Sequence, residues 1–334
     1  MALYRISIVG TGYVGLCTAV GFASKGYEVI TSTHNPEKAH LINSGTSPLF
    51  EPGLEELLRK AVSEGYLKCV LGREEAVLNA EITFVAVATP SQPDRGISLQ
   101  HIQNSTREVG EAINKKNTYH MVVVKSTVVP GTTKNIVKTI LEKYSNKRCG
   151  TDFGLCMNPE FLRQGSAVYD SLHPDRIVIG EHDKISGDIL QNLYQEFYNE
   201  EMPPIIRTKI PTAELIKYAN NAFLATKVSL INQIANICEK LPGTDVNVVA
   251  KAIGLDRRIG SLFLNAGLGY GGSCLPKDLK ALIVFSKDLG YHPTLLNAVE
   301  LVNNSQPHKA VELAEKALGD LKGKRIAIWF SLQA

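Results

Sequence analysis

Short apolar runs alternate with longer amphipathic segments through the first two thirds of the chain. The runs at residues 4–9, 27–31, 82–88, 121–125, 153–157 and 177–179 are rich in β-branched residues, as buried strands are. Apolar residues recur at helical spacing at 16–25, 36–43, 53–64, 74–79, 99–114, 130–144 and 186–198. Because strands alternate with helices, the pattern predicts an α/β domain built on a doubly wound parallel sheet.

The last third of the chain is predicted to be helical almost throughout. Pro211 opens a helix that continues to Leu241, and this length favours a helix that connects two domains. Further helices are expected at 246–253, 279–289 and 293–318, followed by a strand at 325–330. A strand with nothing left to pair with is not a stable end. We therefore predict an α/β domain at 1–210, an all-α central domain at 211–320, and the start of a truncated C-terminal domain at 321–334.

Composition and charge exclude several classes of protein. A length of 334 residues, with 44% hydrophobic and 21% charged residues, is typical of a soluble protein of two or three domains. The net charge of +3, without a long basic run, argues against nucleic acid or a membrane surface as partner. No apolar stretch reaches transmembrane length, and no signal peptide is seen. The six scattered cysteines lack metal-ligand spacing, so we expect no metal and a reducing, cytoplasmic setting.

A glycine-rich turn follows the first predicted strand. Gly10, Gly12 and Gly15 form GxGxxG between that strand and a helix, with Tyr13 and Val14 inside the motif. Glycines there allow a tight turn and a close approach to a pyrophosphate, which meets the free N–H groups of the helix. The motif predicts a Rossmann-like dinucleotide site. Thr89, at the carboxyl end of a later strand, is expected to border the same ligand.

The end of the second predicted strand lacks the usual acid. A carboxylate normally binds the adenosine ribose at this point, but Thr33 stands there instead. Thr33 could bind a hydroxyl, and the absent charge would tolerate a 2′-phosphate, which Lys38 could assist. We therefore expect NAD as cofactor, with NADP as the alternative.

Four further residues are candidates for chemistry. Cys274 follows a Gly-rich stretch and has Lys277 and Asp278 close behind it, neighbours that can make a thiol nucleophilic. The alternative is a buried structural cysteine, which is the commoner case. Lys217 and Asn221 lie four apart, hence on one helical face, although Lys is usually solvated. Glu160, just past a predicted strand, is either a base or a loop acid.

Taken together, these segments resemble the UDP-glucose 6-dehydrogenase family, one of the nucleotide-sugar dehydrogenases, which also include GDP-mannose dehydrogenase. The resemblance covers nearly the whole chain, in the family's order. The matching segments are Gly10–Gly15, Pro48–Leu58, Thr89–Pro90, Lys125–Thr127, Asn158–Leu162, Glu214–Asn232 and Gly271–Asp278.

The resemblance implies an enzyme that oxidises the CH₂OH of UDP-glucose to the carboxylate of UDP-glucuronate, a precursor in polysaccharide biosynthesis, in two hydride transfers. Cys274 would trap the intermediate aldehyde as a thiohemiacetal, which becomes a thioester. Lys217 and Asn221 would stabilise the C6 oxygen. Asp278 and Thr127 would position the hydrolytic water, and Glu160 would be the base.

The resemblance also implies contacts with the ligands and a homodimer formed through the central helix. Arg258 would reach the substrate of the neighbouring subunit. The remaining substrate contacts are Glu160, Phe161, Leu162, Lys217, Asn221, Phe263 and Gly271. Lys277 and Gln164 would lie near the cofactor, as would Thr127.

Three departures from the family pattern affect this interpretation. Thr33 replaces the ribose-binding acid, Gln164 replaces a frequent Glu, and the C-terminal domain that grips the nucleotide is absent. GDP-mannose or another nucleotide sugar therefore stays open as substrate. A catalytically impaired dimer that still binds dinucleotide is the alternative from a different class.

Overall fold

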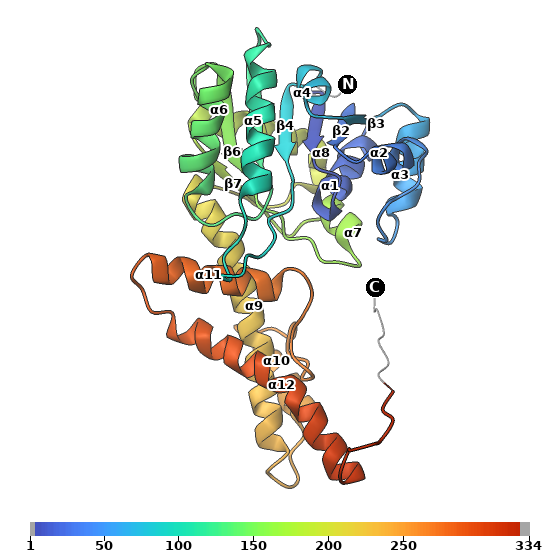
Figure 1. Ribbon diagram of the computed structural model, residues 1–334, viewed down its shortest axis with the longest axis vertical. Coiled ribbons are helices and arrows are strands. Elements are labelled where there is room, and N and C mark those ends of the chain that lie inside the picture. The colour runs from blue at the N-terminus through green and yellow to red at the C-terminus, as the bar shows by residue number, and fades with distance from the viewer. Residues whose placement is uncertain (1–3, 328–334) are drawn as a thin grey trace. The chain divides into compact units, whose positions relative to one another are not determined.

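The computed structural model describes residues 4–327, which divide into two compact units (Figure 1). Unit 1 comprises residues 4–90 and 98–217, and unit 2 comprises residues 91–97 and 218–327. The long helix α9, Ile210–Cys238, begins in unit 1 and continues into unit 2. Residues 325–327 are not in a strand, and the rest of the strand expected at 325–330 lies outside the described residues.

Unit 1 is built on an eight-stranded sheet with the order β3-β2-β1-β4-β5-β6-β7-β8. All neighbouring strands are parallel except β6 and β7, which are antiparallel. The order 3-2-1-4-5-6 is that of doubly wound dinucleotide-binding domains, so the predicted fold class is confirmed. The strands are β1 Ile6–Val9, β2 Val29–Thr33, β3 Leu67–Leu71, β4 Ile82–Val85, β5 His120–Val124, β6 Phe153–Met157, β7 Ile177–Glu181 and β8 Ile205–Lys209.

Helices cover both faces of this sheet. Apolar side chains of α1, α2, α3, α7 and α8 pack into the core on one face, where Phe22 of α1 meets Phe84 and Phe197 with ring centroids 5.5 and 4.9 Å away. Helices α4, α5 and α6 supply the core on the other face. The helices of unit 1 are α1 Tyr13–Ser24, α2 Pro36–Asn43, α3 Leu54–Ser63, α4 Glu74–Leu78, α5 Gln100–Asn114, α6 Lys138–Ser145, α7 Ala167–Leu172 and α8 Lys184–Tyr198, with a π-helical turn η1 Thr133–Val137 and a 3-10 turn η2 Asn199–Glu201.

Two strands and one helix start were not predicted. β3 is exposed at Lys68 and Leu71, and β8 is a partly exposed edge strand after Pro203-Pro204, so neither has the continuous apolar run of a buried strand. The helix expected at 279–289 begins four residues earlier, as α11 Leu275–Asp288 with Pro276 in its first turn. That earlier start makes Cys274 the N-cap residue of α11.

Unit 2 consists of the rest of α9 together with α10 Val246–Gly254, α11 and α12 Thr294–Leu318. α9 and α12 are joined by polar contacts, among them the Ser229 hydroxyl, which donates to the Val299 carbonyl at 3.0 Å. Arg95 of the short segment 91–97 pairs with Glu300 of α12.

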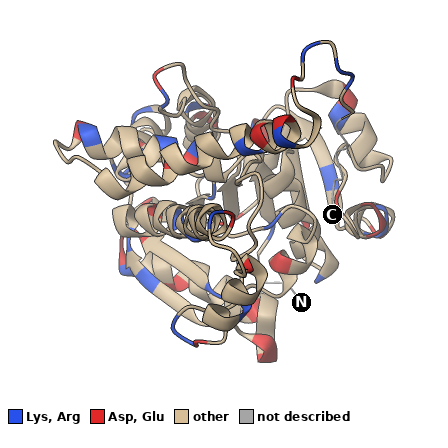
Figure 2. Cartoon of the chain, turned by 90° about the horizontal axis from the view of Figure 1, so that it is seen from below, with Lys and Arg blue, Asp and Glu red and all other residues tan. Residues whose placement is uncertain are grey.

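Charge and hydropathy along the described residues give little further evidence for the division into units 1 and 2. Basic and acidic residues are both scattered over the helices and loops, as the blue and red segments of Figure 2 show. Within residues 4–327, no helix is both long enough and apolar enough to span a bilayer.

Candidate active site

The glycine-rich turn between β1 and α1 leaves a space that backbone amides face. Gly10 has a φ of +113°, and a Cβ there would lie 2.5 Å from the Ala86 carbonyl oxygen. A Cβ on Gly15 would lie 2.1 Å from the Gly10 oxygen, so the first helical turn packs directly on the loop. A Cβ on Gly12 would meet no atom within 4 Å. The space in front of Gly12, at the N-terminus of α1, therefore fits a dinucleotide pyrophosphate.

β2 ends at Thr33, where no carboxylate stands. The Thr33 hydroxyl accepts a hydrogen bond from the Asn35 amide at 3.2 Å, and the Asn35 side chain caps α2 by accepting from the Lys38 amide at 3.0 Å. The Arg73 guanidinium, which the sequence interpretation did not include, lies 2.5 Å from His34 and pairs with Glu108 at 2.5 Å. Arg73 could not be recognised from the sequence because it follows β3, a strand that was not predicted.

The carboxyl ends of β4 and β5 bring two predicted threonines together. The Thr89 hydroxyl donates to the Thr127 carbonyl at 2.9 Å. Thr89 follows β4, which is adjacent to β1, and Thr127 follows β5, the next strand, near the point where a dinucleotide lies in folds of this strand order.

Glu160 and Lys217 form a buried ion pair. The Lys217 ammonium lies 2.9 Å from a Glu160 carboxylate oxygen, and the side chains are 4% and 7% exposed. The second oxygen of Glu160 accepts from the Leu162 amide at 2.6 Å. Both charges are thus compensated, and removal of either would leave the other buried without its partner. The two carboxylate oxygens have separate donors, so the orientation of Glu160 is fixed.

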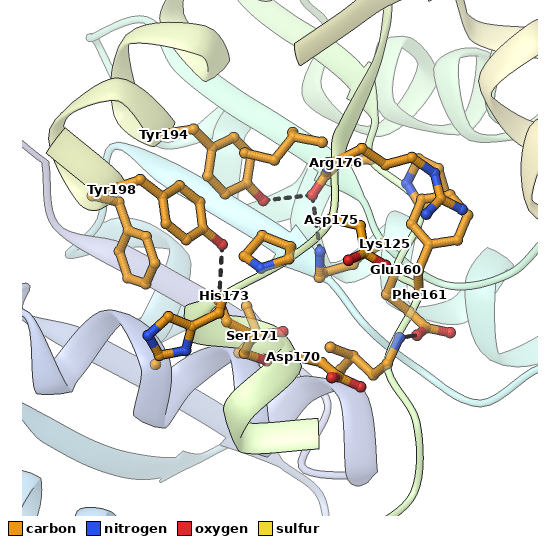
Figure 3. A pocket seen from close by; sticks show the side chains of 18 of the residues that line it. Lys125, Glu160, Phe161, Asp170, Ser171, His173, Asp175, Arg176, Tyr194 and Tyr198 are labelled. Atoms are coloured by element: carbon orange, nitrogen blue, oxygen red, sulfur yellow. Dashed lines mark hydrogen bonds between the residues drawn. The ribbon is translucent and has the colours of Figure 1, made fainter. Parts of the chain in front are cut away.

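A second polar cluster lies behind Glu160 on the face of the sheet covered by α1 and α8. The Lys125 ammonium and the Tyr194 hydroxyl both donate to the Asn158 side-chain oxygen, at 2.9 and 2.6 Å. Figure 3 labels the two donors and marks both bonds with dashed lines. Burial lowers the pKa of Lys125 to about 8, although the Glu160 carboxylate opposes this shift. These residues line a cavity of about 180 Å³ that also reaches Glu160 and Phe161. Lys125 and Asn158 were recognised only as members of matching motifs.

Phe161 is held from one side by a cation. The guanidinium of Arg176 lies 3.9 Å from the centre of the Phe161 ring, and the Lys217 ammonium lies 5.5 Å from it. Figure 3 shows Arg176 and Phe161 side by side. This contact fixes the ring next to the Glu160–Lys217 pair.

Unit 2 brings together three other predicted residues. The Asn221 amide nitrogen donates to one Asp278 oxygen at 2.6 Å, and the Lys277 ammonium lies 2.5 Å from the other. The Asp278 side chain is 1% exposed, and its backbone amide donates to the Cys274 carbonyl at 2.8 Å. Cys274 itself is exposed, with its sulfur 3.6 Å from the Ser273 hydroxyl.

The other predicted contact residues are spread over loops. Arg258 is exposed and pairs with Asp256 at 2.6 Å, a contact that raises the pKa of Arg258. Phe263 has the left-handed φ of +64°, which is uncommon without glycine. A Cβ on Gly271 would meet open space. Gln164 is exposed in the loop after Leu162.

The matches to known proteins follow the same order along the chain as the two units described above. Residues 4–198 match the NAD binding domain of the UDP-glucose/GDP-mannose dehydrogenase family, and residues 211–305 match its central domain. The chain belongs to this family. It is therefore a member of a family of nucleotide-sugar dehydrogenases. Unit 1 is built around an NAD-binding domain. The glycine-rich turn between β1 and α1 fits such a ligand.

Individual relatives cover nearly the whole chain. A UDP-glucose 6-dehydrogenase of Haloferax volcanii is 43% identical over 325 residues, which are 97% of this chain and 75% of the relative. A GDP-mannose 6-dehydrogenase of Pseudomonas syringae is 42% identical over 92% of this chain and 70% of the relative. A solved UDP-glucose dehydrogenase structure from Pyrobaculum islandicum has a TM-score of 0.89 and 42% identity, covering 95% of this chain and 71% of that one.

Proposed function

We propose that this protein oxidises UDP-glucose to UDP-glucuronate by two successive two-electron steps. The observation that carries the proposal is the arrangement at the start of α11: an exposed Cys274 stands one turn before a buried Asp278 that holds Asn221. A thiol open to a ligand, beside oriented polar groups, suits covalent capture of an aldehyde. NAD, when bound to unit 1, accepts the hydride in each oxidation.

Cys274 keeps the reacting carbon attached through the second oxidation. Its sulfur adds to the aldehyde carbon to give a thiohemiacetal, and loss of a hydride and a proton then gives the thioester. Water attacks the thioester carbon and the C–S bond breaks, which releases the carboxylate and restores the thiol. Covalent capture explains how one site can carry out both oxidations without releasing the aldehyde.

Charged and amide groups stabilise the developing negative charge and transfer protons at this carbon. Lys217 and Asn221 stabilise the negative C6 oxygen as it develops. Glu160, whose orientation is fixed by Lys217 and the Leu162 amide, is the proposed base for hydrolysis. Asp278 and Thr127 position the water.

In this proposal, backbone and side chains of unit 1 provide all the cofactor contacts except that of Lys277, which belongs to unit 2. The amides of the glycine-rich turn bind the pyrophosphate, and Thr33 and Lys38 face the adenosine ribose. NAD is the proposed cofactor, and NADP is the second candidate because Thr33 adds no negative charge and Arg73 lies close by. The complete proposed set is Gly10, Gly12, Tyr13, Val14, Gly15, Thr33, Lys38, Thr89, Thr127, Gln164 and Lys277.

The sugar and its nucleotide have their own proposed contacts. Phe161, held by Arg176, and Leu162 border the sugar. Phe263 and Gly271 supply contacts from unit 2, and Arg258 reaches the substrate of the partner subunit. The Arg258 side chain is exposed, as a contact with the substrate of another subunit requires.

A homodimer through α9 is part of the proposal. Phe223, Leu230 and Ile237 lie seven residues apart on α9 and are 66%, 55% and 57% exposed. Residues at this spacing share one helical face, and an apolar stripe of this kind is suited to pairing with a second copy. We place the protein in the cytoplasm, where Cys274 would stay reduced.

A second candidate substrate is GDP-mannose. A relative that is 42% identical over 92% of this chain is a GDP-mannose 6-dehydrogenase, so the matching segments do not distinguish the two sugars. The test is a steady-state assay of the chain with each nucleotide sugar and each dinucleotide. Reduced cofactor formed with UDP-glucose and not with GDP-mannose supports the proposal. If neither sugar is oxidised while dinucleotide still raises the melting temperature, the chain is a binding protein.

A further inference from the structure

The segment Pro48–Leu58 matches the family motif but has no assigned role. Within it, Phe50 is 85% exposed, whereas the next residue, Glu51, is 5% exposed. A buried carboxylate is costly unless hydrogen bonds compensate it. Glu51 lies in the connection between α2 and α3 and is not among the residues proposed for chemistry.

The Glu51 carboxylate joins two loops of unit 1. One oxygen accepts from the Ala167 amide at 2.6 Å. The other accepts from the Gly165 amide at 2.9 Å and from the Tyr13 hydroxyl, which forms a short contact. The Gly165 amide also lies 3.0 Å from the Tyr13 hydroxyl, so these groups form one closed cluster.

Each loop in this cluster has a proposed function. Tyr13 follows Gly12 directly and is the first residue of α1, where the pyrophosphate is expected. Gly165 ends the loop that carries Glu160, Phe161 and Gln164. A carboxylate that is hydrogen-bonded to both loops fixes the distance between them, because hydrogen bonds to a charged acceptor are short and strong.

We propose that Glu51 is a positioning residue, which locks the loop of residues 160–167 to the first residue of the dinucleotide-binding helix. Glu51 touches neither ligand; it acts through Tyr13 and Gly165. The inference rests on the proposed function. It adds that binding of dinucleotide and of nucleotide sugar both depend on this carboxylate.

The test compares Glu51→Gln, Tyr13→Phe and the double variant with the wild type. Glutamine keeps the size of the side chain but places an NH₂ group where two amides and a hydroxyl need acceptors. The control is Glu56→Gln, an exposed acid five residues away on α3. NADH fluorescence titration gives the dinucleotide dissociation constant, UDP-glucose kinetics give kcat and KM, and thermal unfolding gives the folded fraction.

In Glu51→Gln we expect the dissociation constant for NADH to rise at least tenfold and kcat/KM for UDP-glucose to fall at least tenfold. Tyr13→Phe should show part of both effects, and the double variant should resemble Glu51→Gln, because one cluster is removed in each. Values within twofold of the control, or losses that only follow the unfolded fraction, would overturn the inference. If the wild type does not oxidise UDP-glucose, the proposed function fails, while the NADH titration still decides the role of Glu51.

Discussion

At the scale of single residues, the proposed catalytic groups differ in burial and in ion pairing. Glu160 and Lys217 are almost completely buried and paired, whereas Cys274 is exposed. A buried pair has a fixed geometry because each charge needs the other. An exposed thiol is free to meet a substrate, which suits the covalent step proposed for Cys274.

Cys274→Ser is expected to remove sugar-acid formation. A serine hydroxyl in place of the thiol is a much weaker nucleophile, so the aldehyde is no longer trapped. Formation of UDP-glucuronate, followed by chromatography, should fall at least a hundredfold, while NADH binding is retained. Cys238→Ser, at a half-buried cysteine on α9, is the matched control. Sugar-acid formation at the wild-type rate in Cys274→Ser would rule out the thioester route.

Thr33 is expected to allow NADP to bind. Without a carboxylate at this place, a 2′-phosphate is not repelled, so the NADP dissociation constant should be comparable with that of NAD. Thr33→Asp should weaken NADP binding at least a hundredfold, or about 2.7 kcal/mol, and Thr33→Ser should not. Calorimetric titration measures both cofactors. If NADP already binds the wild type a hundredfold more weakly than NAD, Thr33 does not set the preference.

At the scale of elements, the sequence predicted those whose pattern is continuous. β1, β4, β5 and β6 are buried at every position, and a mainly apolar run identified each one. β3 and β8 were missed because exposure breaks their pattern, and with β3 the neighbouring Arg73 was missed. The start of α11 was not predicted because glycines precede Cys274. The position of Cys274 at the N-cap of this helix was therefore found only in the structure.

The pairings within the candidate site were beyond sequence reasoning. Lys217 and Glu160 are 57 residues apart, as are Asn221 and Asp278, and no spacing rule joins such positions. Residue type and family motif identified these side chains as candidates. Neither could identify Glu51 as the acceptor for Tyr13 and Gly165, because that contact depends on how three loops meet.

The start of α9 carries a buried acid whose ionisation is expected to affect stability. Glu214 accepts from the Gly131 and Thr133 amides at 2.5 and 2.8 Å, yet burial raises its pKa from 4.5 to about 7. Because the folded state holds the proton more tightly, this contribution is complete below pH 4.5 and is lost as pH rises through about 7.

Glu214→Gln removes that titration. The free energy of unfolding of the wild type, relative to Glu214→Gln, should fall on the order of 3 kcal/mol between pH 4.5 and about 7. Urea unfolding at several pH values measures it, and taking the difference cancels other groups such as His120. A difference that is constant with pH would show that folding does not shift the pKa of Glu214.

At the scale of the whole molecule, the exposed stripe on α9 is expected to form a subunit contact. Leu230→Glu places a charge in the middle of the stripe, between Phe223 and Ile237, and should convert a dimer into monomers. Analytical ultracentrifugation measures the mass in solution. Lys60→Glu, an exposed change on α3, is the control. A wild-type chain that sediments as a monomer would contradict the proposed dimer.

The central claim is that this chain takes a sugar alcohol to an acid in two oxidations at one cysteine. The most direct measurement is the number of NADH molecules formed for each UDP-glucose consumed, from absorbance and chromatography of the same reaction. We expect two NADH per UDP-glucuronate, without free aldehyde. One NADH per sugar with aldehyde released, or no NADH at all, would contradict it.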